Sequence, residues 1–212
     1  MTTPSESSPS RPDIARDLLA RAESARAFRR TPAHRLAAMT PDELTQLRES
    51  DKGNAQALRH IVAKNRWPGR SLVGEEACRA ALLIALRANH DPSFQRTLLG
   101  MLHEAARRGD ASPAQWAHLH DRCLVHAERQ QVYGTQHWFR TDGRLEPHPV
   151  ADPDNLDARR AQVSLPPFAE TAERLRRHHT DPSSLSPPAS TCRSPPPTAR
   201  PSARPTDERP AT

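Results

Sequence analysis

The segment from Glu75 to Asn89 constrains the fold more than any other part of this chain. Its middle is apolar on nearly every side, through Ala77, Ala80, Ala81, Leu82, Leu83, Ile84 and Leu86. A helix that is hydrophobic all round is a buried one. The run is also well short of the ~20 apolar residues that cross a bilayer. We therefore expect a central helix sandwiched by the two helices that follow it, and no membrane span.

Helical periodicity and capping residues predict further helices on both sides of this segment. Thr40-Pro41-Asp42-Glu43 has the form of a capping box with proline in the first turn. Asp91-Pro92 and Ser112-Pro113 are helix starts of the same kind. The expected helices run from Pro12 to Phe28, from Pro41 through Leu44 and Leu47, from Asn54 to Asn65, from Pro92 to before Gly109, and from Pro113 to about Gln130. Residues 66–74 are expected to form a loop.

The pattern changes after Tyr133-Gly134. Short extended runs, 137–141 and 144–146, flank Asp142-Gly143, and an Asp-Gly pair between such runs is a strong hairpin signal. Two short helices follow, over 154–161 and 169–177. The predicted fold is mainly α, a compact helical bundle with one small β-hairpin packed on it.

Composition divides the chain unevenly. Residues 1–11 are rich in serine, threonine and proline, and the chain after Thr180 is mostly serine, proline, threonine and arginine with almost no large apolar residues. Such segments bury too little apolar surface to offset the entropy of ordering. We expect a disordered N-terminus over 1–11, one helical domain over 12–178 and a disordered tail over 179–212. The first twelve residues lack the apolar stretch of a secretory signal, so a cytoplasmic location is expected.

The chain is basic, with a formal net charge of +6. All of its lysine and arginine residues except Lys52 and Lys64 are arginine, a bias that a GC-rich bacterial genome explains in large part. The arginines are interleaved with 25 acidic residues rather than gathered in one stripe, which argues against a nucleic-acid-binding protein. Excess positive charge leaves an anionic ligand or partner open.

The sequence holds no strong signal for a metal or a cofactor. The three cysteines, Cys78, Cys123 and Cys192, are far apart, and no CxxC pair occurs. His60, His90-Asp91 and Asp121 follow the ligand order of HD phosphohydrolases, but Asp91 before Pro92 is more simply a helix cap. Glycine-rich nucleotide loops and a GxSxG nucleophile motif are also missing from the sequence.

Three sequence blocks resemble a bacterial family of unknown function over roughly residues 40–172. They are Trp67-Pro68 with Gly74-Glu75, Asp121-Arg122 with the QxYGTQ block at 131–136, and 157–160 with Leu165-Pro166. By this resemblance, members usually carry Gln-His-Ala-Asp at the end of the central helix. Here those four positions read Leu86-Arg87-Ala88-Asn89, which implies a diverged member whose activity, if the family has one, is altered or lost.

Polar residues around the QxYGTQ block are the candidate site. Amide, phenol, hydroxyl and guanidinium groups orient small polar ligands through hydrogen bonds. The expected pocket for a small polar or anionic ligand consists of Trp67, Gln95, Asp121, Arg122, Gln131, Tyr133, Thr135, Gln136 and Arg160.

Other interpretations stay open. The same polar groups could instead satisfy the loop and each other. The chain could be an enzyme on a small polar or phosphorylated substrate, with Asp121 as the base and Arg122 or Arg160 stabilising negative charge. A third hypothesis is an interaction module that docks a protein through its proline-rich tail.

Overall fold

Capping side chains and prolines set where the helices begin in the computed structural model, which describes residues 9–30, 38–140 and 144–180. Thr40 forms the expected reciprocal capping box with Glu43, and Ser112 forms one with Gln115. The Asp91 carboxylate accepts the Phe94 N–H at 2.9 Å. The helices are α1 (Pro12–Arg30), α3 (Pro41–Asn65), α4 (Arg70–Val73), α5 (Glu75–Arg87), α6 (Pro92–Arg107), α7 (Pro113–His126), α8 (Leu156–Gln162) and α9 (Phe168–Thr180), with a 3-10 turn at Pro153–Asn155.

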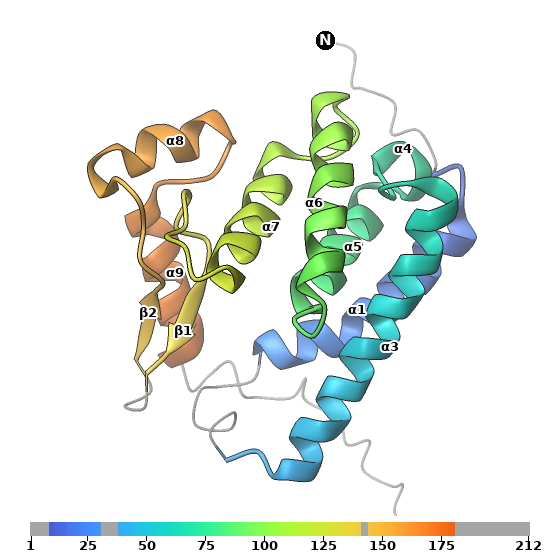
Figure 1. Ribbon diagram of the computed structural model, residues 1–212, viewed down its shortest axis with the longest axis horizontal. Helices are drawn as coiled ribbons and strands as arrows, with labels where there is room; N and C mark the ends of the chain where they lie inside the picture. The colour runs from blue at the N-terminus through green and yellow to red at the C-terminus, as the bar shows by residue number, and fades with distance from the viewer. Residues whose placement is uncertain (1–8, 31–37, 141–143, 181–212) are drawn as a thin grey trace, which may run out of the picture. The chain divides into compact units, whose positions relative to one another are not determined.

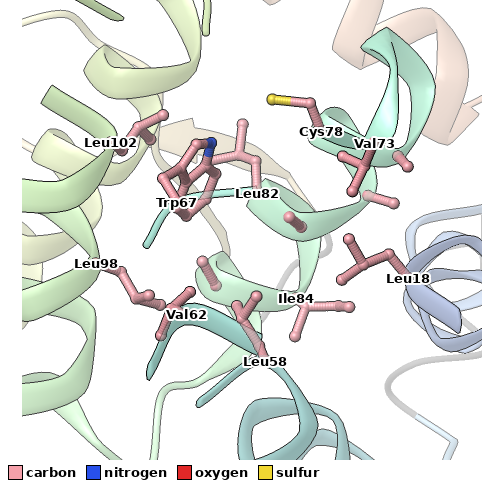
Figure 2. Packing of buried hydrophobic residues seen from close by; sticks show 14 of the residues in the cluster. Leu18, Leu58, Val62, Trp67, Val73, Cys78, Leu82, Ile84, Leu98 and Leu102 are labelled. Atoms are coloured by element: carbon pink, nitrogen blue, oxygen red, sulfur yellow. The ribbon is translucent and has the colours of Figure 1, made fainter. Parts of the chain in front are cut away.

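Helix α5 is the centre of the core, as its all-round apolarity predicts. It packs against α1, α3, α4, α6 and α7 (Figure 1). Leu18 of α1, Leu58 and Val62 of α3, and Leu98 of α6 close on the α5 side chains (Figure 2). The prediction of a central helix is confirmed, and α1 and α3 cover it as well as the two helices that follow it.

The C-terminal part of the fold lies on the far side of α7 from α3. Strands β1 (His137–Phe139) and β2 (Leu145–Pro147) pair antiparallel, with Trp138 opposite Glu146. Figure 1 shows this hairpin, α8 and α9 grouped beside α7. The predicted hairpin and both short helices are confirmed, and the Asp142-Gly143 turn lies outside the described residues.

Several predicted boundaries are wrong. Residues 41–65 form one helix through Gly53 instead of two, and the expected loop 66–74 contains α4. Helix α7 ends at His126 rather than Gln130, so Ala127 lies beyond the helix and is exposed.

The fold is mainly α with one small antiparallel hairpin, as expected. No helix within the described ranges has the length and apolarity to cross a membrane. The expected disordered segments, 1–11 and 179–212, lie almost wholly outside the described residues, so the domain division stays a prediction.

Candidate functional site

Asp121 organises the loop that follows α7. Its carboxylate is fully buried and accepts N–H hydrogen bonds from Val132 at 2.8 Å, from Tyr133 at 3.1 Å and from Thr135 at 3.0 Å. The Thr135 hydroxyl donates to it as well, at 3.0 Å. Burial alone raises the pKa of Asp121, but the His120 imidazole and these amides outweigh it and hold the pKa below its ordinary value. The carboxylate is therefore ionised and occupied by its own loop.

Two glutamines complete the loop. The Gln131 amide donates to the carbonyls of Gln136 and His148 and accepts the Gln136 N–H at 2.8 Å. Gln136 donates in turn to the His118 carbonyl of α7 at 3.1 Å. Both glutamine side chains are buried. They tie the loop to α7 and to the segment after β2.

Arg160 of α8 locks the other side of the loop. Its buried guanidinium donates to the Tyr133 carbonyl at 2.6 Å, to the Pro166 carbonyl at 2.7 Å and to the Thr171 hydroxyl at 2.8 Å. All three acceptors are neutral, and burial lowers the pKa of Arg160. The carboxylates of Asp157 and Asp121 are close enough to raise that pKa, so they offset part of the positive charge of Arg160.

A cavity of about 530 Å³ opens where α5 and α7 face the hairpin, α8 and α9. Its size is typical of small-molecule sites. Among the described residues that line it there is no aspartate or glutamate. The lining comprises Leu82, Leu83, Leu86, Arg87, Asn89, His118, Arg122, Thr135, Gln136, His137, Phe139, Leu145, Arg160, Leu165, Pro166, Thr171, Arg174 and Leu175.

Arg122 is half-buried at this cavity and has fewer partners than Arg87 or Arg160. Its Nε is buried without a hydrogen-bond partner, and no ion pair joins its side chain to any residue within the described ranges. Burial lowers the pKa of Arg122, and the charge of Arg87 lowers it further. An uncompensated guanidinium in a recess is the arrangement that an anion would relieve.

The four positions at the end of α5 where the resembling family is expected to carry Gln-His-Ala-Asp lie at this cavity. Arg87 and Asn89, which stand where the family is expected to carry histidine and aspartate, line the cavity together with Thr135 and Gln136. Arg87 pairs with Asp51 of α3 through two contacts of 2.7 Å. Arg87 thus has an acidic partner that does not itself line the cavity, whereas Arg122 has no acidic partner among the described residues.

The structure brings some of the expected site residues together and not others. Arg122, Thr135, Gln136 and Arg160 line the cavity. Five others do not: Asp121, Gln131 and Tyr133 shape the loop behind it, Trp67 lies in the core beside Leu82 and Leu102 (Figure 2), and Gln95 donates to the Ala85 carbonyl at the end of α5.

Three charged or titratable residues at the cavity were not expected from the sequence: His118, His137 and Arg174. His118 lies one helical turn before Arg122 on α7, so helical spacing could have found it. The His137 ring stacks on Phe168 at 6.2 Å between centroids, and its Nε2 is buried without a partner. Arg174 comes from α9, and only tertiary packing places it here.

A metal centre finds no support within the described ranges. They hold no cluster of three or more histidine, cysteine, aspartate or glutamate side chains placed to bind an ion. Asp91 instead caps α6 and pairs with Arg59 at 2.6 Å, and the hydrogen bonds from Ser93 and Phe94, with Arg59 beside it, lower its pKa.

Comparisons with known proteins give a family and no activity. No curated protein and no solved structure matches the chain. A model of a family of unknown function, DUF6624, matches residues 12–180, which include every helix and strand described above. The chain therefore belongs to the DUF6624 family.

Proposed function

We propose that this protein binds a small anionic ligand in the cavity between α5, α7, the hairpin and α9. The observation that carries the proposal is the buried, unpartnered Nε of Arg122 in a lining that holds four arginines and, among the described residues, no acid. Burying a charge without a partner is costly, and an anion that accepts from the guanidinium removes that cost.

Among the polar neighbours at the cavity, Asn89 supplies an amide that can donate to a ligand of this charge. The amide of Gln136 already donates to the His118 carbonyl and to the Thr135 hydroxyl, which itself donates to Asp121. The loop that presents these groups is fixed by Asp121, Gln131 and Arg160 rather than by the ligand. A rigid site of this kind loses little conformational entropy on binding.

An enzyme that uses Asp121 as a base is less well supported. Its lone pairs are occupied by four groups of the loop, and its lowered pKa makes it a weak base. It is also not among the residues that line the cavity. Docking through the proline-rich tail concerns residues outside the described ranges.

The proposal is tested by thermal unfolding of the full chain with simple anions. A ligand present at 100 times its dissociation constant stabilises the fold by about 2.7 kcal/mol. We expect acetate, octanoate or inorganic phosphate to raise the melting temperature, and Arg122→Gln to abolish that rise. Arg129→Gln is the matched control, because Arg129 is exposed just beyond α7 and does not line the cavity. If the anions stabilised the Arg122→Gln and Arg129→Gln variants equally, the cavity would not be an anion site. The same conclusion would follow if they did not stabilise the wild type.

A further inference from the structure

We infer that the anion is an organic monocarboxylate with an apolar body, rather than a phosphate or a phosphate ester. The inference rests on the proposed function and names the chemical class of its ligand. Three features of the cavity carry it: the absence of the usual phosphate cradle among the described lining residues, the helix end that faces the site, and the share of apolar side chains.

The described lining lacks the backbone geometry that proteins use for phosphate. Besides arginine side chains, which bind phosphate and carboxylate alike, phosphate sites commonly use glycine-rich turns and free N–H groups at helix starts. No glycine occurs among the lining residues within the described ranges. Helix α9 begins beside the cavity, but the N–H of its first residue, Phe168, already donates to the Asp157 carboxylate at 2.7 Å.

The nearest end of the central helix disfavours a multiply charged ligand. Helix α5 ends at Arg87, and Leu86, Arg87 and Asn89 all line the cavity. The C-terminal end of a helix carries a partial negative charge, which repels a dianion more than a monoanion. Gln95 offsets part of that charge here, because its amide donates to the Ala85 and Leu86 carbonyls. The positive charge of Arg87 is also balanced in part by Asp51. Arg122 is then the cation at this helix end without an acidic partner among the described residues, and its planar fork can hold one carboxylate bidentately.

Apolar side chains make up much of the remaining wall. Six leucines line the cavity together with Phe139 and Pro166, and they come from α5, both strands, the α8–α9 connection and α9. A small inorganic ion would leave this surface in contact with water, whereas a hydrocarbon or aryl body would cover it. Burying each methylene stabilises a complex by about 0.8 kcal/mol, which corresponds to about a fourfold tighter dissociation constant.

Calorimetric titration of the full chain with a matched set of probes tests the inference. The set is butanoate, hexanoate, octanoate and benzoate, with octanamide as the uncharged control and octyl phosphate and inorganic phosphate as the competing head groups. We expect affinity to rise about fourfold per methylene from butanoate to octanoate. Octanamide and octyl phosphate should bind at least about tenfold more weakly than octanoate, a difference of about 1.4 kcal/mol.

Two variants assign the effects to the two halves of the cavity. Arg122→Gln should weaken octanoate to the level of octanamide, and Arg129→Gln should leave it unchanged. Leu175→Gln, on α9, should reduce the gain in affinity per methylene. If the affinity of the wild type did not change with chain length, and benzoate bound no more tightly than butanoate, the inference that the ligand has an apolar body would be wrong.

Failure of this inference can be told apart from failure of the proposed function. Octyl phosphate or inorganic phosphate could bind more tightly than octanoate, with that binding still lost in Arg122→Gln. The anion site would then stand, and the inference that its ligand is a carboxylate would be wrong. If none of the anions binds in a way that depends on Arg122, both proposals are wrong.

Discussion

At the scale of single residues, one buried carboxylate organises the loop that forms the cavity wall. The substitution Asp121→Asn keeps the shape of this side chain but removes its charge, and it turns an amide N–H₂ donor toward backbone N–H groups that then lack an acceptor. We expect the free energy of unfolding to fall by about 2–4 kcal/mol, because hydrogen bonds to a charged group are strong and unmet buried donors are costly. Urea unfolding measures the change.

The exposed Asp154 provides the matched control for that substitution. Asp154→Asn should change stability by less than about 0.5 kcal/mol, as surface substitutions usually do. If both variants lost a similar amount of stability, the effect of Asp121→Asn would come from the change in the net charge of the domain and not from the loop that Asp121 holds.

The sequence indicates this neighbourhood but not the role of each residue in it. The clustering of Asp121, Arg122 and the polar residues at 131–136 correctly marks a place where the chain gathers polar groups. Which of them face the cavity depends on the loop's path, and Asp121 and Gln131 point inward to the backbone because it has several N–H and C=O groups to satisfy.

At the scale of elements, the long helix α3 carries a glycine in its interior. Gly53 is exposed, and a Cβ added there would meet nothing within 4 Å. Since glycine costs a helix roughly 0.5–1 kcal/mol relative to alanine, Gly53→Ala should raise the free energy of unfolding by about that amount. Thermal or urea unfolding of the purified chain measures it.

The opposite result is expected for the glycine inside the QxYGTQ block. Gly134 has a φ of +63°, and a Cβ there would lie 3.0 Å from the Phe168 ring. Gly134→Ala should therefore destabilise the fold, by about 1–3 kcal/mol for the backbone conformation and the contact together. If Gly53→Ala were the more damaging of the two substitutions, the continuous α3 would be in doubt.

Elements whose signals are local were predictable, and those decided by packing were not. The helix starts at Thr40, Asp91 and Ser112 follow from a side chain a few residues away from the groups that it caps. Gly53 breaks the apolar pattern of residues 41–65 without breaking the helix, because α3 is held by its packing on α1 and α5. Likewise α4 is a single turn whose backbone is anchored by distant Asp110, which accepts from Ser71 N–H at 2.7 Å.

At the scale of the whole molecule, three partly buried histidines couple stability to pH. Burial lowers the pKa of His126, of His137 and of His148 from the ordinary value of 6.5. The charge of Arg122 lowers the pKa of His126 and of His148 further. The charges of Arg160 and His148 lower the pKa of His137. Burial and the nearby arginine charges therefore both make these three histidines harder to protonate in the folded protein.

This coupling predicts that the fold loses stability as the solution is acidified. Below about pH 6.5 the unfolded chain takes up protons on these histidines that the folded chain takes up only at lower pH. Stability is therefore fully present above that value and falls as the pH drops towards the folded pKa values. Asp121 does not oppose the trend, since its lowered pKa keeps it ionised throughout.

We expect the melting temperature to decrease steadily between pH 7.5 and 5.5, and His137→Gln to make the decrease shallower. His60→Gln is the control, since His60 lies on the exposed side of α3, away from the cavity. A melting temperature that is constant or rises on acidification would show that the histidines near the cavity are hydrated enough to protonate in the folded protein.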